Sequence, residues 1–395
     1  MKILVLNFNL KGVGTYRRSF YFSRELTRHG HDVAMVTVSK DSKYRPRVYY
    51  KRDWIGQVDQ PVGEGPWVRI IEGPNLGYKW LPGWGSGPID IALRIKEILK
   101  GSYDVVYGFE YHPNVSWPVY LTRPFMRYRF YSDWCDWFAG NSNQMRGWKI
   151  AHKIDGWREE HIRFIAEKVT VTSKTLYQRA RSIGIPEEKI VHIPESAATD
   201  YIPWIPVEKA RAFFGFPENV PVVLTGVDWE TERSLLIFAE VLKKVPDALL
   251  ILLGREHPSA ARKAYEMGIS EHVHFTGWVS DEDYPRYIAC ADVCFLPLED
   301  CLLHRARWPA KILDYLAAGR PVVTNGVGEV LDLFTQREVG VLAPYDVDKM
   351  ADAIANLLKD QERRLYLGQQ ARRVMEEEWD WRVRGRKIAE VVEKV

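Results

Sequence analysis

The sequence has no long apolar run, and this excludes a membrane-spanning helix. Its longest apolar stretches, such as Ala248–Leu253, are far shorter than the roughly 20 residues that a helix needs to cross a bilayer. The first residues, MKILVLNF, lack the longer apolar region and small-residue cleavage site of a signal peptide. We therefore expect a cytoplasmic protein whose N-terminus is a first β-strand.

Cysteine is also scarce, and the four cysteines show no CxxC or metal-ligand spacing: Cys135, Cys290, Cys294 and Cys301. This pattern suits a reducing compartment. Asp133 and Asp136 are close enough in sequence to suggest a metal site, but no neighbouring residues complete a ligand set. We predict no metal centre.

Charge is unevenly distributed along the 395 residues. Residues 1–200 hold 30 basic and 21 acidic side chains, a net charge of +9, whereas residues 201–395 hold 25 and 31, a net charge of −6. A basic first half favours an anionic partner, such as a membrane surface or an acidic acceptor. A solvated surface with unevenly placed lysines explains the same counts. We predict no nucleic-acid partner.

Buried strands alternate with helical patterns along most of the chain, and this predicts an α/β protein with parallel sheets. A proline-dense linker at 194–206 predicts a boundary between two domains. The domains that we predict are 1–195, 205–378 and a final helix, 379–395. The predicted strands are 3–6, 32–38, 103–107, 129–133, 169–172, 190–193, 222–225, 248–253, 273–276, 293–296 and 321–324. The predicted helices are 15–29, 89–99, 174–182, 234–245, 284–290, 309–318, 350–358, 361–378 and 379–395.

Residues 40–88 interrupt this alternation. They are rich in glycine, proline and aromatic residues and have little helical periodicity. The aromatic residues include Trp54, Trp67, Tyr78, Trp80 and Trp84. A long irregular segment inside a compact domain is usually functional or mobile. The aromatic side chains could stack on sugars, lie at a lipid interface, or pack back over the sheet.

Two predicted strands of the first domain are followed by candidate site residues. Gly12 and Gly14 follow the first strand, where open α/β sheets bind ligands and where glycine lets a phosphate or sugar approach the backbone. Glu110 and His112 follow the strand at 103–107. A histidine there can donate a hydrogen bond or transfer a proton, so these two are the catalytic candidates. A structural loop histidine is the alternative.

The segment 304–329 (HRARWPAKILDYLAAGRPVVTNGVGE) holds the strongest local pattern. Pro309 begins a helix that Gly319 ends, and a short buried strand and a glycine turn follow. Lys311 lies in the first helical turn, where unpaired N–H groups and the helix dipole favour an anion. Asp314 lies one turn further on. A nucleotide sugar would suit this arrangement, although an ordinary βαβ edge with a solvated Lys and Asp would have the same sequence.

The order of several segments resembles that of the family-4 retaining glycosyltransferases. These segments include GVGTYRRSFYFSRELTRHGHDVAMV, VHFTGWVSDEDYPRYIACADVCFLP and PAKILDYLAAGRPVVTNGVGE. The resemblance implies the GT-B fold, with two Rossmann-like domains that face each other across a cleft. It further implies a UDP- or GDP-sugar donor in the C-terminal domain, an acceptor in the N-terminal domain and no separate cofactor.

Residue by residue, the resemblance carries over unevenly. The Glu-x7-Glu signature of the family would fall on Ala306 and Asp314, of which Asp314 can still accept hydrogen bonds from ribose hydroxyls. The usual Arg and Lys after the first C-domain strand align near Val227 and Glu232, neither of which is basic. Possible substitutes that would neutralise the diphosphate are Arg233, Arg255, Arg305, Arg307 and Lys311. Trp278 and Val279 match the place where backbone meets the base, and Gly328 and Glu329 match the glycine turn.

The resemblance therefore predicts hexose transfer with retention and without a metal ion. The acceptor would be a lipid, a glycan or a small molecule, and a lipid-linked acceptor would put the protein at the membrane periphery. An epimerase of the same fold, a non-catalytic nucleotide-sugar binder and a nicotinamide dehydrogenase that uses Gly12 and Gly14 stay open as alternatives. The missing third glycine, since position 17 is Arg, weakens the dehydrogenase. The sugar, the base, the acceptor and the oligomeric state stay open.

Overall fold

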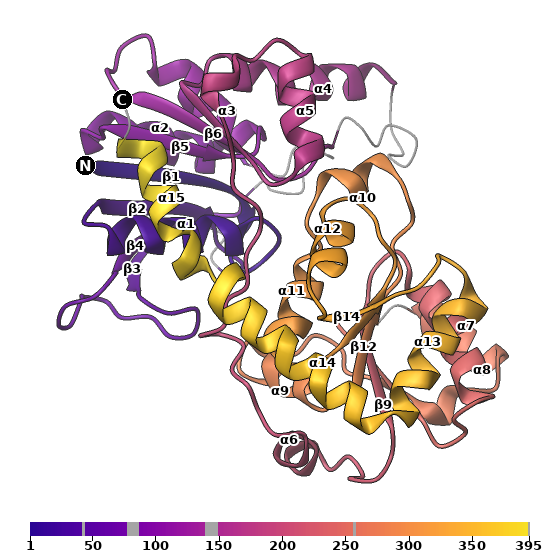
Figure 1. Cartoon of the computed structure of the whole chain (residues 1–395). Helices are drawn as coiled ribbons and strands as arrows, with labels where there is room; N and C mark the ends of the chain where they lie inside the picture. Colours follow the sequence, from indigo (N-terminus) through magenta and orange to yellow (C-terminus); the bar gives the residue numbers. More distant parts are fainter. Residues whose placement is uncertain (42–43, 77–86, 139–148, 256–257, 394–395) are drawn as a thin grey trace. The chain divides into compact units, whose positions relative to one another are not determined.

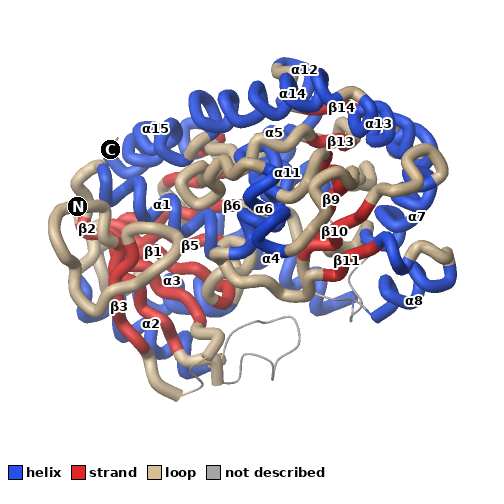
Figure 2. The backbone as a smooth tube through the Cα atoms, turned by 90° about the horizontal axis from the view of Figure 1, so that it is seen from below, coloured by secondary structure: helices blue, strands red, loops and turns tan. Residues whose placement is uncertain are grey.

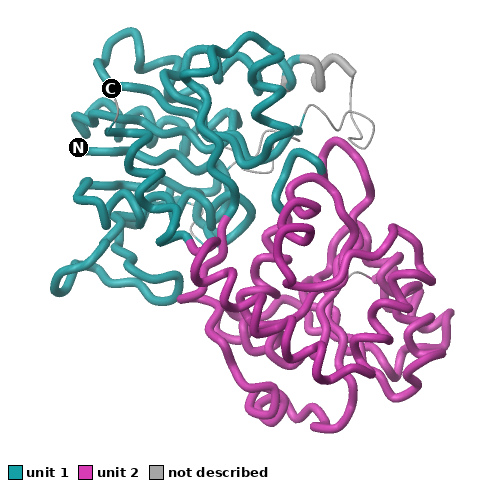
Figure 3. Tube along the Cα trace, in the orientation of Figure 1, with its two compact units in different colours: residues 1–195, 305–308, 381–395 teal, residues 196–304, 309–380 magenta. Residues whose placement is uncertain are grey.

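The computed structural model describes residues 1–41, 44–76, 87–138, 149–255 and 258–393, which form two compact units (Figure 3). Unit 1 comprises residues 1–195, 305–308 and 381–395, and unit 2 comprises residues 196–304 and 309–380. Each unit is built around its own sheet and is described separately below.

Unit 1 contains an eight-stranded sheet with the order β3-β4-β2-β1-β5-β6-β7-β8. All neighbouring pairs are parallel except β3 and β4, which pair antiparallel. The strands are β1 (Lys2–Leu10), β2 (Asp32–Val38), β3 (Arg47–Lys51), β4 (Val68–Gly73), β5 (Val105–Phe109), β6 (Arg129–Trp134), β7 (Lys168–Val171) and β8 (Ile190–His192).

Helices cover both faces of this sheet (Figure 2). α1 packs on α15, and α2 packs on α3. The helices are α1 (Tyr16–Arg28), α2 (Pro88–Gly101), α3 (Pro113–Thr122), α4 (Lys149–Phe164), α5 (Lys174–Ser182) and α15 (Trp381–Glu393).

The contact between α1 and α15 is aromatic. The indole of Trp381 stacks on the ring of Tyr21, with centroids 5.8 Å apart, and meets Phe22 edge-on at 5.7 Å. All three side chains are fully buried. Large rings in these geometries contribute more than their buried area alone, so α15 is an integral part of the core of unit 1.

The structure corrects the interpretation of residues 40–88 as irregular. This segment contributes β3 and β4, which extend the sheet at one edge. Trp54 packs back into the core, where its ring meets Tyr16, Phe20 and Tyr21. Tyr78, Trp80 and Trp84 lie outside the described residues.

Unit 2 contains a six-stranded parallel sheet with the order β11-β10-β9-β12-β13-β14. Figure 1 labels β9, β12 and β14 of this sheet. Its strands are β9 (Val222–Gly226), β10 (Leu249–Leu253), β11 (Val273–Phe275), β12 (Val293–Leu296), β13 (Val322–Thr324) and β14 (Gly340–Leu342). Its helices are α6 (Val207–Phe214), α7 (Thr231–Leu242), α8 (Pro258–Glu266), α9 (Asp283–Ala289), α11 (Ala310–Ala317), α12 (Glu329–Gln336), α13 (Val347–Lys359) and α14 (Gln361–Val374). A short helix, α10 (Leu302–Ala306), ends in the segment that belongs to unit 1.

The structure confirms the predicted α/β class and parallel sheets. Every predicted strand is present within a few residues, and the predicted helix at 309–318 is α11, followed by Gly319 in the left-handed conformation. The sequence analysis missed the strands β3, β4 and β14 and the helices α3, α4, α6, α8, α10 and α12. Among the described residues, no helix has both the length and the apolar content required to cross a bilayer.

Candidate functional site

In unit 1 the candidate residues flank the point where the strand order reverses. The chain proceeds outward from β1 to β2 and then returns to place β5 on the other side of β1. Ligands of open α/β sheets bind at the carboxyl ends of strands beside such a switch point. Gly12 and Gly14 follow β1, and Glu110 and His112 follow β5, so all four predicted residues lie at this edge.

The turn after β1 is held by a polar network that the sequence analysis missed. The Asn7 side-chain amide donates to the Thr37 hydroxyl (2.9 Å), and the Thr15 hydroxyl donates to Asn7 Oδ1 (3.1 Å). Asn9 Nδ2 donates to the Thr15 hydroxyl (3.2 Å), and a Cβ at Gly14 would lie 2.4 Å from that same nitrogen. Because Gly14 also has a φ of +54°, glycine is required there for both space and conformation.

His112 precedes helix α3, and its ring is fixed by aromatic neighbours. The imidazole stacks on Phe8 of β1, with centroids 3.7 Å apart and planes 2° apart, and meets Phe138 edge-on at 5.4 Å. Burial, with the charges of Arg158 and Arg163, lowers the pKa of His112 to about 3. The imidazole is therefore neutral at physiological pH, and its buried Nδ1 has no hydrogen-bond partner among the described residues.

Glu110 is fully buried, and both of its oxygens are engaged. Oε1 accepts hydrogen bonds from the backbone N–H groups of Cys135 (2.7 Å) and Asp136 (3.0 Å), and Oε2 pairs with Arg163 (3.1 Å). Glu110 also adopts φ +68°, a conformation that costs energy for a residue with a side chain. Its geometry suits a residue that fixes the loop after β6 beside His112.

Asp133, the last residue of the strand predicted at 129–133, lies in strand β6, and its carboxylate forms a buried ion pair. Both of its oxygens meet the Arg18 guanidinium at 2.9 Å, and the Thr170 hydroxyl donates to one of them at 2.5 Å. Arg18 also donates to the carbonyl of Ile193 (2.8 Å). This network joins α1, β6 and β7, so Asp133 stabilises the sheet and is not available to a ligand.

The segment 305–308 belongs to unit 1, although the sequence analysis assigned it to the donor site with α11. Ala306 is buried in the core of unit 1, and its carbonyl accepts a hydrogen bond from the Ser173 hydroxyl (2.7 Å). The Arg305 side chain is exposed. The charge of Arg307 acts on Asp136, where it opposes the rise in pKa that burial causes.

In unit 2 the strand order reverses between β9 and β12, and Lys311 lies there. Lys311 is the second residue of α11, in its first turn as predicted. Its ammonium donates to the Val227 carbonyl (3.0 Å) and pairs with Asp228 (2.9 Å), both just after β9. A Cβ at Gly226 would lie 2.7 Å from the Lys311 side chain, so this glycine leaves room for the lysine.

Asp314 is almost fully buried and accepts a hydrogen bond from the Tyr284 hydroxyl (2.9 Å). The Tyr284 ring is parallel to that of Tyr201, with centroids 6.2 Å apart. A contact between Asp314 and a ribose hydroxyl therefore stays a prediction that would involve the hydroxyl of Tyr284 as well.

Arg233 lies in the first turn of α7, within a cluster that the sequence analysis did not foresee. Its guanidinium lies 4.0 Å from the centre of the Tyr345 ring and 3.5 Å from Glu230. The Tyr345 hydroxyl in turn donates to Glu230 (2.9 Å). The arginine is thus oriented at the start of a helix, with about a third of its side chain exposed.

The loops after β10 and β11 meet at a single bridge between Gly254 and Gly277. This bridge brings the neighbouring residues Arg255 and Trp278 together at one edge of the sheet. Both side chains are exposed, and Val279 beside them is partly buried. The indole of Trp278 is 64% exposed.

Gly328 precedes helix α12 and has a φ of +56°, which favours glycine. Glu329 is the first residue of that helix and is buried. The predicted turn therefore ends at a helix N-terminus, with backbone N–H groups that the helix leaves unpaired.

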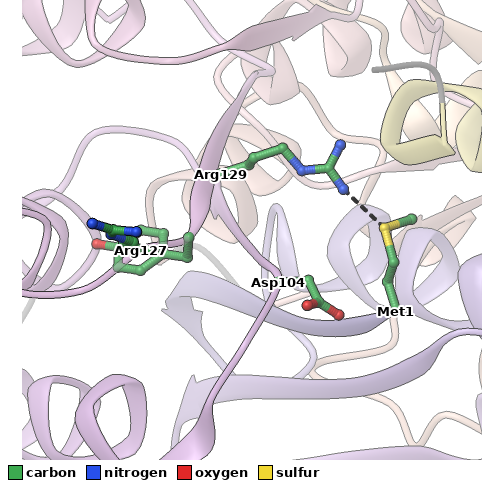
Figure 4. Close-up of a pocket in the computed structure, with 5 residues that line it drawn as sticks. Met1, Asp104, Arg127 and Arg129 are labelled. Carbon is green, nitrogen blue, oxygen red and sulfur yellow. Dashed lines mark hydrogen bonds between the residues drawn. The ribbon is translucent and has the colours of Figure 1, made fainter.

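A surface hollow of about 460 Å³ lies where the strands of the unit 1 sheet begin, at the end opposite to Gly12 and His112 (Figure 4). Its lining residues are Met1, Asp104, Arg127, Tyr128 and Arg129, and the Arg129 guanidinium donates to the Met1 sulfur at 2.9 Å. These residues stand at or before the amino ends of β1, β5 and β6. Because ligands of α/β sheets bind at the carboxyl ends, we do not place the site there.

Comparisons with known proteins agree with this arrangement. Residues 222–360 match the family model described as "Glycosyl transferases group 1". A GDP-mannose-dependent alpha-(1-6)-phosphatidylinositol monomannoside mannosyltransferase of Mycolicibacterium smegmatis is 29% identical over 240 residues, which are 58% of this chain and 62% of that protein. The chain thus spans about three fifths of the length of that relative.

Two further similarities cover the whole chain. An MMP alpha-(1->4)-mannosyltransferase of Mycolicibacterium hassiacum is 24% identical over 100% of this chain and 98% of its own. The structure of a sucrose-phosphate synthase from Thermosynechococcus elongatus superposes with a TM-score of 0.76 at 19% identity, over 100% of this chain and 98% of that one.

The fold is therefore that of the GT-B glycosyltransferases, with two Rossmann-like α/β units. Within it, residues 222–360, which match the model of the Glycosyl transferases group 1 family, include Lys311, Asp314, Gly328 and Glu329.

Proposed function

We propose that this protein is a retaining glycosyltransferase that moves a hexose from a nucleotide-diphosphate sugar to a lipid, glycan or small-molecule acceptor. The observation that carries the proposal is Lys311, a cation in the first turn of α11, at the switch point of the unit that matches the family. A lysine beside unpaired helix N–H groups favours a diphosphate. Because the relative from Mycolicibacterium smegmatis is named as GDP-mannose-dependent, a GDP-sugar is the first donor to test.

In the proposed donor site, unit 2 supplies most contacts to the donor, and Gly12 and Gly14 stay candidates for a close approach of its phosphate or sugar to the backbone. Lys311 and the N-terminus of α11 stabilise the charge that develops on the leaving diphosphate, and Arg233 and Arg255 are the next candidates. Trp278 and Val279 would lie against the base, Asp314 near the ribose, and the N-terminus of α12 after Gly328 near the sugar or phosphate. About a third of Lys311 and of Asp228 is exposed, so their ion pair can open toward a phosphate at modest cost.

In the proposed catalytic site, unit 1 supplies His112. As a neutral imidazole, His112 donates or accepts a hydrogen bond at the transferred sugar or the acceptor hydroxyl and does not act as a strong acid. Glu110 is a positioning residue, since its oxygens hold two backbone N–H groups and Arg163. Arg305 and Arg307 stay candidates for contacts that Ala306 does not make.

The proposed reaction retains the configuration of the sugar. The bond between the anomeric carbon and the leaving phosphate breaks, the acceptor oxygen bonds to the same face of that carbon, and the acceptor proton passes to the departing phosphate. Charge on that phosphate is stabilised by Lys311 and the helix N-terminus, so the step needs no bound metal ion.

A lipid-linked acceptor is the one we favour. The relative from Mycolicibacterium smegmatis acts, by its name, on a phosphatidylinositol monomannoside. The net charge of +9 on residues 1–200 suits an anionic membrane surface. We therefore propose that the protein works in the cytoplasm at the periphery of a membrane.

A screen for release of nucleoside diphosphate tests the proposal. GDP- and UDP-hexoses are incubated with the protein, with and without phosphatidylinositol and simple sugars as acceptors, and the anomeric configuration of any product is determined by NMR. Acceptor-dependent release with an unchanged configuration is expected. Interconversion of the donor without release would indicate an epimerase, and tight donor binding without either reaction would indicate a non-catalytic binder. A product of inverted configuration would contradict the proposed mechanism.

A further inference from the structure

Helices α3 and α4 of unit 1 expose large apolar side chains toward solvent. The exposed fraction is 81% for Phe125, just after α3, and 60% for Trp157 on α4. We define the α3–α4 aromatic face by its members, which are Trp117, Tyr120, Leu121, Phe125, Ile154, Trp157, His161 and Phe164. Contiguous apolar surface of this kind is uncommon on a soluble protein unless something covers it.

The two helices contribute to one continuous surface. The Trp117 ring meets Tyr120 edge-on at 6.3 Å, and the Tyr120 ring lies 5.8 Å from the imidazole of His161. The Tyr120 hydroxyl and His161 Nδ1 are 3.1 Å apart, within hydrogen-bond distance. The indole of Trp157 stacks on the imidazole of His161, with ring centroids 4.5 Å apart.

Helical spacing explains why these side chains are exposed together. Ile154, Trp157, His161 and Phe164 recur every three or four residues and therefore share one face of α4. The neighbouring residue Ile162 points the other way, into the core. On α3, the core-facing residues are Val115 and Val119, and the outward-facing ones are Trp117 and Leu121. Both helices thus carry apolar side chains on their core-facing side and, in addition, on the outer side, where charged residues are expected.

The charge of the α3 segment is positive, whereas residues 149–167, which carry α4, hold four basic and four acidic side chains. Residues 113–129 contain three arginines and no aspartate or glutamate. Arg127 is exposed. Two acidic residues of the α4 segment are paired: Glu160 with Arg179, and Glu167 with Arg123 at 3.7 Å. Aromatic rings flanked by arginines complement the interface of a bilayer that contains anionic phospholipid.

We propose that the α3–α4 aromatic face is the surface with which this protein docks on anionic phospholipid membranes. Its rings enter the interfacial layer, and Arg123 and Arg127 approach the phosphates of the headgroups. The aromatic residues at 40–88 suggested a different surface, but Trp54 of that segment is buried in the core.

The position of the face also fits a lipid acceptor, and this part rests on the proposed function. Helix α3 begins directly after His112. Because a helix rises about 1.5 Å per residue, Trp117 stands only about 7.5 Å further along the axis. A headgroup that projects from the docked bilayer beside α3 would therefore lie within reach of His112.

Co-sedimentation of the full chain with vesicles tests the docking surface. The vesicles contain phosphatidylcholine alone or phosphatidylcholine mixed with phosphatidylglycerol. The variant Trp117→Ser/Phe125→Ser/Trp157→Ser should partition onto the mixed vesicles at least about ten-fold more weakly than the wild type, since the inserted apolar area is lost. The matched control, Phe213→Ser/Tyr265→Ser/Leu365→Ser, removes three apolar side chains of unit 2 that are 58–79% exposed and should bind as the wild type does.

A second pair of variants separates charge from apolar insertion. Arg123→Gln/Arg127→Gln should weaken binding to the mixed vesicles by roughly ten- to thirty-fold and have little effect on vesicles of phosphatidylcholine alone. Raising the salt concentration should reproduce this loss in the wild type. A wild-type protein that stays in the supernatant, or a triple aromatic variant that binds normally, would overturn the inference.

Two measurements keep this inference distinct from the proposed function. Calorimetric titration with GDP should give the same affinity for the wild type and the triple aromatic variant, because the donor site lies in unit 2. If vesicle binding depends on the face but no donor is ever consumed, the docking surface stands and the glycosyltransferase proposal fails. If instead the wild type forms a dimer without vesicles and the triple aromatic variant does not, the face is covered by a second copy and membrane docking is wrong.

Discussion

The two units treat their charged residues in opposite ways at the strand ends that we assign to the site. In unit 1, the pairs Arg18–Asp133, Arg94–Asp90 and Arg163–Glu110 are all almost completely buried. In unit 2, about a third of each side chain in the pair Lys311–Asp228 is exposed, and Arg233 is exposed to a similar degree. Buried pairs hold a scaffold in one arrangement, whereas half-exposed ones can exchange partners.

This difference suggests that the two units have different roles in the site. The charged pairs of unit 1 are buried inside the fold, and its candidate catalytic residue is a neutral histidine, His112, that packs against aromatic rings. Unit 2 keeps cations near the surface, where a diphosphate could replace their present partners. The contrast supports, on physical grounds, the proposed assignment of the donor to unit 2.

The largest effect should follow from breaking a buried pair of unit 1. Asp133→Ala removes the carboxylate that meets the buried Arg18 guanidinium at two points and leaves it with the longer ion pair to Glu195, at 3.6 Å, so we expect the free energy of unfolding to fall by about 3–5 kcal/mol. Guanidinium unfolding followed by fluorescence measures this. The matched control is Asp228→Ala, which removes the carboxylate of a half-exposed pair in unit 2 and should cost about 1 kcal/mol or less. Equal losses in the two variants would remove the contrast between the units.

An intermediate effect should appear in donor binding. Lys311→Ala removes a charge-assisted contact worth about 1.5–3 kcal/mol, so the affinity for GDP or UDP should fall roughly ten- to one-hundred-fold, with little change in stability. Isothermal titration calorimetry measures both affinities. Lys359→Ala, at the end of α13, is the control for general loss of positive charge and should bind normally. Identical isotherms for wild type and Lys311→Ala would refute the donor-site assignment.

The smallest effect at neutral pH concerns the pH dependence of stability, because it develops only as the pH falls. His112 has a native pKa of about 3, below the ordinary value of 6.5, so the unfolded chain binds a proton that the native protein does not between these pH values. Stability should therefore fall as the pH drops from about 6.5 toward 3. His112→Gln should reduce the slope by up to about 1.4 kcal/mol per pH unit.

Urea unfolding at a series of pH values between 4 and 7 tests this. Some acid sensitivity should persist in His112→Gln, because burial also lowers the pKa of His192, to about 4. His192→Gln should therefore flatten the same part of the profile independently. An unchanged slope in His112→Gln would mean that the imidazole is already protonated or solvated in the native protein.

The features that the sequence predicted correctly depend on local rules. Helix α11 could be located because Pro309 and Gly319 mark its ends, and Lys311 was therefore placed in the first turn. The missed elements depend on distant partners or contradict those rules. Strand β3 exists because it pairs with β4, and α3 contains Pro118, a residue that usually ends a helix.

The candidate site follows the same logic. Spacing alone placed His112 after a strand, but its stacking on Phe8 arises because β1 and β5 are neighbours in the sheet. The partners of Lys311 and Arg233, namely Asp228 and Tyr345, come from other elements of unit 2. Position after a strand is the one signal in the sequence that could have indicated Asp228.

The aromatic contact of Trp381 with Tyr21 and Phe22 has a consequence for biosynthesis. During translation, the residues of unit 2 (196–304 and 309–380) leave the ribosome before α15 is made, whereas the face of α1 that α15 covers is made before them. Unit 1, although it begins the chain, is therefore completed last. Nascent chains arrested before residue 381 should expose the Tyr21 and Phe22 rings and bind chaperones that recognise apolar segments.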